Sequence, residues 1–138
     1  MVSDLGALGR DIKRVQARNH RDADVRLRPL GLTIVQWDAL RNLHENPDLS
    51  LHDLAQLTFQ TDQSCGTLAA RLVSRGFVQR REAGGRAVTH VLTARGDELR
   101  READSVVAAV LEQSFAPLDE SERMQLSGLM SLLLRGRP

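Results

Sequence analysis

Residues 50–92 read SLHDLAQLTFQTDQSCGTLAARLVSRGFVQRREAGGRAVTHVL and decide the fold. Ser50 with Asp53 three residues later, and Thr61 ahead of a second amphipathic run, are patterns that begin helices. The two starts leave room only for a tight connection, and a hairpin pattern follows the second helix. This order predicts a winged helix-turn-helix, within a fold that is mainly α with a small β-hairpin wing.

The second of these helices divides into an apolar and a polar face. Apolar residues recur at the spacing of one buried stripe, at Cys65, Leu68, Ala69, Leu72 and Val73. The opposite face carries mostly short polar side chains, at Thr61, Asp62, Gln63, Ser64, Thr67, Ala70, Arg71 and Ser74. Such side chains reach base edges or phosphates without keeping a helix out of a major groove. We expect this helix to read duplex DNA, with an ordinary solvated polar face as the alternative.

The wing is predicted from the residues that follow. Gly76 stands where a C-terminal helix cap belongs, and we expect residues 77–81 to pair with residues 86–92. Arg80, Arg81 and Arg86 gather around this hairpin with only Glu82 to offset them, although the whole chain has a net charge of only +1. The residues expected to serve DNA binding are Ser50, Thr61, Asp62, Gln63, Ser64, Thr67, Arg71, Arg80 and Arg86.

Composition favours a small, mostly helical regulator. The 138 residues suit one domain or one domain with extensions. Of these residues 41% are hydrophobic but only 3% are aromatic, so Leu, Val and Ala must supply the packing. The N-terminal segment carries too many charges for a signal peptide or membrane span, which predicts a cytoplasmic protein. The chain has one cysteine, and its four histidines share no ligand spacing, so we expect no metal site. It also has no phosphate-binding loop and no nucleophile paired with a base, so we expect no cofactor and no catalytic residue.

The flanking segments are predicted to be helical and to join two copies of the chain. An apolar stripe runs along the N-terminal segment, Thr93 precedes a long helix that ends near residue 115, and Asp119 with Glu122 forms a capping-box pattern. We expect residues 1–30 and 93–138 to form a dimerisation region and residues 31–92 to form the DNA-binding domain. The tail at residues 129–134 is too apolar to stay exposed to water, so we expect it to pack against the second copy. The alternative is that this tail folds back on its own domain.

A twofold dimer has a direct consequence for the target. It presents two recognition helices about one DNA turn, roughly 34 Å, apart. The expected target is therefore an inverted repeat that is read in successive major grooves.

Three strings of the chain together resemble the MarR family of bacterial transcription regulators. They are GLTIVQWDAL at residues 31–40, the run of residues 50–81, and VLTARG at residues 91–96, which is similar to the family's wing strand and its LTxxG motif. The resemblance implies an obligate homodimer with a winged helix-turn-helix in each subunit. It also implies control of nearby genes, usually repression, that is relieved by a small, often aromatic or phenolic effector.

The wing departs from the family pattern. The family usually carries Asp-x-Arg there, and the Asp holds the Arg for insertion into the minor groove. Arg86 fits the Arg, but Gly84 occupies the Asp position. We expect Arg86 in a narrow minor groove with weaker anchoring than usual, and a solvated wing-tip charge is the alternative.

The effector pocket is predicted at His20, Trp37, Asp38 and Arg41. The Trp37-Asp38 pair is similar to the urate-responsive branch, although Leu68 replaces that branch's Arg and the first helix has no Trp. Trp37 as a core residue and Asp38 as a plain surface carboxylate are the alternatives.

Two other functions stay open at this point. Cys65 near a helix start could sense oxidants, but its inward position favours a small core residue. The second function is that of a winged-helix module that binds only proteins. Such a module would be expected to expose apolar or acidic residues on its recognition face.

Overall fold

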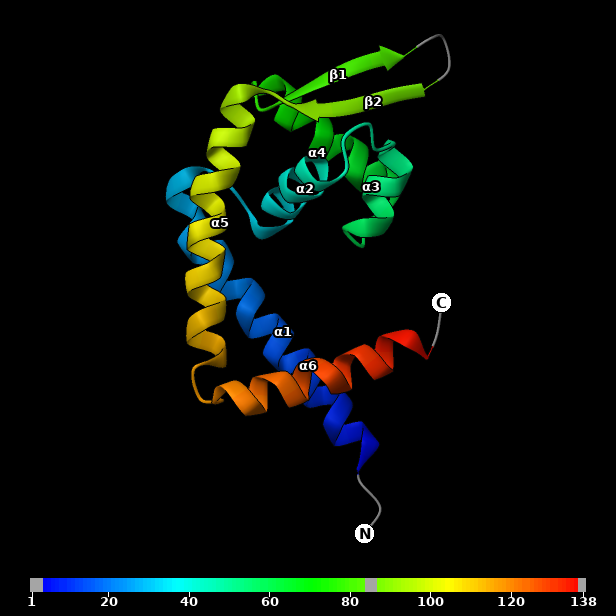
Figure 1. Cartoon of the computed structure of the whole chain (residues 1–138). Coiled ribbons are helices and arrows are strands. Elements are labelled where there is room, and N and C mark those ends of the chain that lie inside the picture. Colours follow the sequence, from blue (N-terminus) through cyan, green and yellow to red (C-terminus); the bar gives the residue numbers. More distant parts are fainter. Residues whose placement is uncertain (1–3, 84–86, 137–138) are drawn as a thin grey trace.

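The computed structural model of the chain describes residues 4–83 and 87–136. Within these ranges it holds six α-helices, one short 3-10 helix and one two-stranded antiparallel sheet (Figure 1). In chain order the elements are α1 (Leu5–Leu27), η1 (Arg28–Leu30), α2 (Ile34–Glu45), α3 (Leu51–Leu57), α4 (Asp62–Ser74), β1 (Val78–Ala83), β2 (Ala87–Leu92), α5 (Ala94–Phe115) and α6 (Glu120–Arg135). The predicted fold class, a helical chain with one hairpin, is confirmed.

Every α-helix begins at a residue whose side chain caps it. The side chains of Asp4, Thr33, Ser50, Thr61, Thr93 and Asp119 each accept a hydrogen bond from a backbone N–H of the first turn. Capping boxes form at Thr33 with Gln36 and at Asp119 with Glu122, as the sequence predicts. These caps fix the helix starts locally, independently of how the helices later pack.

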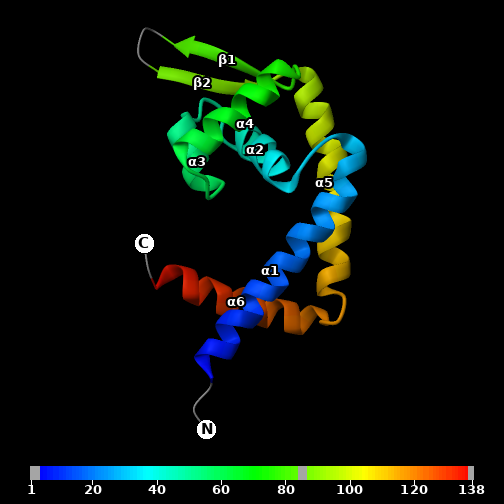
Figure 2. The same cartoon turned by 180° about the vertical axis from the view of Figure 1, so that it is seen from behind.

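The molecule has two parts, which we call the winged-helix lobe (α2, α3, α4, β1 and β2) and the helical arm (α1, α5 and α6). Helix α5 leaves the hairpin and runs to the far end of the arm, packed against α1 (Figures 1 and 2). Helix α6 crosses α1 at that far end, and residues 123–130 of α6 line one cavity with residues 11–19 of α1. No helix in the described ranges has the length and apolar character needed to cross a membrane.

The core lies where the lobe meets α5 and the end of α1. The largest fully buried side chains are Leu27, Leu40, Leu54, Leu72 and Cys65, and α5 adds Ala103, Val107 and Val110. Helix α6, in contrast, has no buried residue, and Leu129, Leu132, Leu133 and Leu134 are 60–77% exposed. The alternative in which this tail folds back on its own domain is therefore wrong for the single chain, and a large apolar surface stays uncovered.

Close backbone packing joins the hairpin to α5. The two strands pair from Val78 with Leu92 to Ala83 with Ala87. At the junction, the Thr93 backbone N–H donates to the Phe77 carbonyl at 3.1 Å, and the Thr93 hydroxyl donates to the Gly76 carbonyl at 2.6 Å. Gly96 lies so near that a Cβ on it would sit 1.9 Å from the Phe77 oxygen. Only glycine fits this position without moving the backbone.

A polar network fastens α2 to α5. The Trp37 indole N–H donates to Asp104 Oδ1 at 2.9 Å, and Arg100 donates to the other oxygen of Asp104 at 2.6 Å and to Asp97 at 2.8 Å. Hydrogen bonds from Arg100 hold the pKa of Asp97 below its ordinary value. The bond from Trp37 to Asp104 thus joins the lobe to the arm in addition to the apolar core, and Arg100 holds Asp104 in place for it.

Candidate nucleic-acid interface

The polar face of α4 is exposed as predicted. Thr61, Asp62, Gln63, Ser64, Thr67 and Arg71 are all open to solvent, while Cys65, Ala69 and Leu72 are buried. The buried stripe is narrower than the sequence pattern indicates, because Leu68 is only half-buried and Val73 is 36% exposed. Thr61 caps the helix by accepting from the Ser64 backbone N–H at 3.1 Å. Four of the predicted contact residues, Gln63, Ser64, Thr67 and Arg71, therefore lie together on one accessible surface.

A groove of about 400 Å³ runs between this face and the start of α2. Thr33 and Gln36 line it opposite Gln63, Ser64 and Arg71. The sequence assigns Thr33 and Gln36 only a capping role, because nothing in a local pattern indicates that the start of α2 lies beside α4. The groove adds hydroxyl and amide groups to the candidate interface.

Asp62 is held by a neighbour that the sequence does not reveal. Its carboxylate lies 2.9 Å from Nδ1 of His52, a residue of α3. A carboxylate facing DNA phosphates is repelled, so the contact with His52 favours an orienting role for Asp62 over a direct contact with DNA.

The hairpin places its arginines differently. Arg80 and Arg81 are exposed on β1, whereas Ser50 is half-buried and its backbone bridges to Thr89 of β2. Ser50 thus ties the start of α3 to the wing. Arg86 and Gly84 lie outside the described residues, so the role of Arg86 at the wing tip stays a prediction.

A second cavity, of about 490 Å³, lies on the other side of α4, against the hairpin. Its lining residues are Leu51, Gly66, Ala70, Val73, Arg80, Val88 and His90. His90 is only 6% exposed, and its Nδ1 atom has no hydrogen-bond partner in the part of the chain that the structure describes. Burial and then the charge of Arg80 lower the pKa of His90 below 6.5. The cavity thus combines apolar walls with the cation of Arg80, while the Nδ1 atom of His90 is itself closed to solvent.

Of the four residues predicted for an effector pocket, three contact other residues and His20 is exposed. His20 is exposed on α1, and Trp37 donates to Asp104 as described. Asp38 pairs with Arg41 at 2.6 Å, and the Arg41 guanidinium also stacks over the Trp37 ring. None of the four lines the two cavities above or the larger cavity described next. These cavities give the predicted pocket no support.

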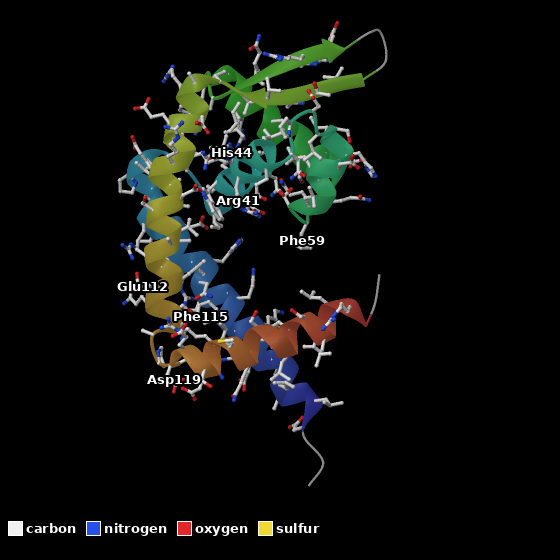
Figure 3. All side chains as sticks on the ribbon, in the orientation of Figure 1. Arg41, His44, Phe59, Glu112, Phe115 and Asp119 are labelled. Carbon is white, nitrogen blue, oxygen red and sulfur yellow. The ribbon has the colours of Figure 1, made fainter. Side chains whose placement is uncertain are left out.

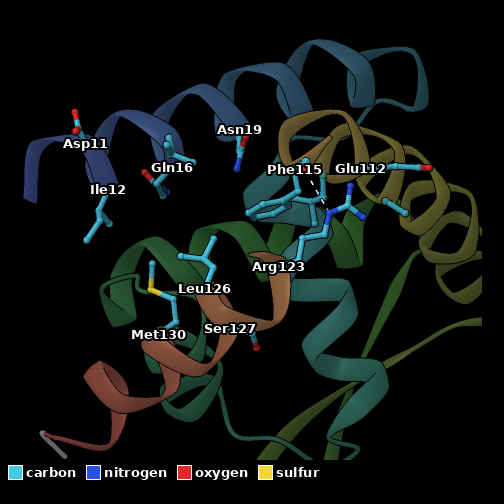
Figure 4. Close-up of a pocket in the computed structure, with 13 residues that line it drawn as sticks. Asp11, Ile12, Gln16, Asn19, Glu112, Phe115, Arg123, Leu126, Ser127 and Met130 are labelled. Atoms are coloured by element: carbon cyan, nitrogen blue, oxygen red, sulfur yellow. Dashed lines mark hydrogen bonds between the residues drawn. The ribbon is translucent and has the colours of Figure 1, made fainter. Parts of the chain in front are cut away.

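The exposed apolar surface of the arm is hollowed. A cavity of about 970 Å³ lies between α1, α5 and α6, with apolar walls that include Ile12, Phe115, Leu126 and Met130 (Figure 4). Arg123 of α6 reaches across to donate to the Phe115 carbonyl at 3.3 Å. An exposed apolar groove of this size is typical of a surface that binds another molecule, such as a protein chain or a ligand.

Cys65 is poorly placed for redox sensing. Its side chain is fully buried, and this burial raises the pKa of the thiol, with the charge of Asp62 as a second cause. The thiolate is the reactive form of cysteine, so the environment suppresses its chemistry.

Comparison with known proteins places this geometry in a family. The sequence model of the MarR family matches residues 30–87. The HTH-type transcriptional repressor Rv2887 of Mycobacterium tuberculosis is 31% identical over 134 residues, which are 96% of each chain. The chain belongs to the MarR family. A MarR-family chain is a DNA-binding transcription regulator that works as a homodimer, and it is not an enzyme.

Solved structures of Rv2887 agree with this MarR assignment. Its complex with salicylic acid superimposes with a TM-score of 0.78 at 31% identity and covers 96% of this chain and 97% of that one. Its complex with DNA gives a TM-score of 0.76 at 30% identity, covering 96% of this chain and 98% of that one. The likeness thus extends over both the winged-helix lobe and the helical arm.

Proposed function

We propose that this protein is a cytoplasmic homodimeric repressor that binds an inverted-repeat operator and leaves it when a small aromatic acid binds. The observation that carries the DNA-binding part is the exposed face of α4, which gathers Gln63, Ser64, Thr67 and Arg71 beside a capped helix N-terminus. Residues 31–92 form the DNA-binding unit, and residues 1–30 with 93–138 form the dimerisation unit.

Each α4 lies in a major groove of the operator. Gln63, Ser64 and Thr67 face base edges, where amide and hydroxyl groups can both donate and accept. Arg71 and Arg80 contact phosphates on either side of the helix, and Arg86 enters the minor groove. The positive end of the α4 dipole adds attraction for a phosphate near Thr61.

Two copies join through the apolar surface of α1, α5 and α6. This surface includes the groove of about 970 Å³ and the exposed leucines of α6. Covering it removes apolar area from water, which stabilises association by roughly 25 cal/mol per Å² before the entropic cost of binding. The resulting twofold axis sets the two α4 helices about 34 Å apart and requires an inverted repeat.

The effector occupies the cavity between α4 and the hairpin. Arg80 supplies a cation for a carboxylate, and His90 lines the cavity beside it. Leu51, Val73 and Val88 provide apolar contacts for a ring. Salicylic acid, the ligand in the Rv2887 complex, has this chemistry. Because Arg80 cannot pair with an effector carboxylate and a DNA phosphate at once, effector binding weakens the hold on the operator.

Gel shifts with DNA from immediately upstream of the protein's own gene, at two salt concentrations with nonspecific competitor, test the DNA-binding part. Gln63→Ala should cost about 1 to 3 kcal/mol on the operator and little on competitor. Gln113→Ala, an exposed amide of α5 far from α4, is the matched control. Equal binding of operator and competitor, followed by failure of selection from random DNA, would favour a protein-binding module instead.

The effector part has its own test. Arg80→Gln should reduce the salt dependence of binding by about one phosphate contact and should abolish release by salicylate. Arg81→Gln, its exposed neighbour on the same strand, does not line the cavity and should keep the release. Release that survives in Arg80→Gln would refute this site for the effector.

A further inference from the structure

Phe59, in the turn between α3 and α4, combines two unfavourable properties. Its φ angle is +56°, a left-handed conformation that bulky residues rarely adopt, and its side chain is 96% exposed. The backbone around it forms a Schellman motif, in which the Phe59 N–H donates to the Gln56 carbonyl and the Gln60 N–H donates to the Ala55 carbonyl at 2.8 Å. Glycine is the usual residue at this place of the motif, so the turn itself does not require an aromatic ring.

The turn holds the ring on a fixed support. The Thr58 hydroxyl donates to the Leu54 carbonyl at 2.7 Å, and the Gln60 side-chain amide donates to the Thr58 hydroxyl at 2.8 Å. Thr58 is itself buried. A rigid backbone that presents an exposed aromatic side chain loses little conformational entropy when that side chain is covered, which favours a binding role.

The direction of Phe59 shows which surface it extends. The ring points away from the hairpin, toward the side of the molecule on which α6 ends (Figure 3). Figures 1 and 2 both show the C-terminal end of α6 beneath the lobe on this side. Leu132 and Leu133 of α6 are 61% and 64% exposed, so they do not cover Phe59 within the same chain. Phe59 and the α6 leucines thus both stay uncovered within the single chain.

We propose that Phe59 contacts the second copy of this chain, so that the homodimer interface extends from the helical arm onto the winged-helix lobe. This inference rests on the dimer of the proposed function. Its support is continuity, because a partner seated on α1 and α6 meets the side of the lobe that carries Phe59. Each such contact occurs twice in a twofold dimer, which doubles its effect on association.

Duplex DNA is a poorer occupant for this ring. Aromatic side chains bind nucleic acids by stacking on unpaired bases, which a duplex does not present. The turn at residues 56–60 carries no cation to accompany such a contact. Phe59 also lines none of the three cavities described above, which argues against a small-molecule role.

Photo-crosslinking of the full chain distinguishes these occupants. A benzophenone amino acid in place of Phe59 should give a covalent dimer of the chain upon irradiation, both without and with operator DNA. The same group in place of Gln79, an exposed residue of β1 on the wing, serves as the control and should give no covalent dimer.

A crosslink from position 59 to DNA overturns the inference, and so does a sample that sediments as a dimer but yields no covalent dimer. A chain that sediments as a monomer overturns both this inference and the dimeric operator complex, whereas loss of the crosslink with intact operator binding overturns the inference alone.

A substitution series measures the strength of the contact. Asn tolerates the left-handed conformation, so Phe59→Asn should fold normally by circular dichroism and raise the dimer dissociation constant about tenfold. Phe59→Tyr keeps the ring and should retain the parent dissociation constant in sedimentation. Equal dissociation constants for Phe59→Asn and the parent chain would overturn the inference.

Discussion

Gly96→Ala tests the junction between the wing and α5. The new Cβ would lie 1.9 Å from the Phe77 carbonyl oxygen and 2.8 Å from its carbon, and both are backbone atoms that cannot turn aside. Either the hairpin or α5 must shift. The shift displaces the same carbonyl that accepts from the Thr93 N–H at 3.1 Å.

The magnitude follows from these contacts. Overpacking in a tight site costs about 1 to 3 kcal/mol, and a lost hydrogen bond costs about 0.5 to 1.5 kcal/mol. Alanine recovers somewhat under 1 kcal/mol of helix propensity. We therefore expect the free energy of unfolding to fall by about 1 to 3 kcal/mol, with weaker operator binding because the hairpin is displaced from α4.

Urea denaturation at one fixed protein concentration measures this loss, since the stability of a dimer depends on concentration. Gly9→Ala is the matched control, because Gly9 lies inside α1 and a Cβ there meets nothing within 4 Å. That variant should gain about 0.5 to 1 kcal/mol. A Gly96→Ala protein within about 0.5 kcal/mol of the parent chain would refute the reasoning, because surface substitutions commonly have effects of that size.

Three further predictions concern buried polar groups. Cys65 should react with a disulfide reagent far more slowly in the folded chain than in urea, because burial raises the pKa of its thiol; equal rates would contradict this. Burial in the folded state lowers the pKa of His90 below its ordinary value, so His90 binds a proton more readily in the unfolded chain. The free energy of unfolding should therefore fall as the pH drops below about 6.5. His90→Val should flatten that dependence in urea titrations between about pH 7.5 and 5.5, and parallel slopes would count against it. Trp37→Phe removes the hydrogen bond to Asp104 and should cost about 1 kcal/mol, measured by circular dichroism because the chain's single Trp is lost.

Local patterns made much of this fold predictable. A cap such as Thr61 and a box such as Thr33 with Gln36 act within one helical turn, so the sequence alone locates those helix starts. The polar face of α4 follows equally from helical periodicity. Prediction succeeded where the interacting residues are close in sequence.

Residues brought together from distant elements were not predictable in this way. Trp37 and Asp104 are 67 residues apart, and no periodicity links them. The cavity at His90 exists only because the hairpin packs beside α4, and the left-handed turn at Phe59 contradicts the residue's own preference. The predicted effector residues came from a family resemblance, although the i, i+3 spacing of Asp38 and Arg41 is itself the pattern of an ion pair within one helix.

Helix α5 also has a mechanical consequence. Its 22 residues make a rod of about 33 Å that spans from the hairpin to the far end of the arm. Because the Trp37 bond to Asp104 and the apolar core tie α2 to this rod, the lobe must follow any tilt of α5. A tilt of about 5° at the dimer end would carry the hairpin about 3 Å, close to the 3.4 Å rise of one base pair. Small changes of angle within the dimer are thus enough to move the two DNA-binding lobes out of register with their half-sites.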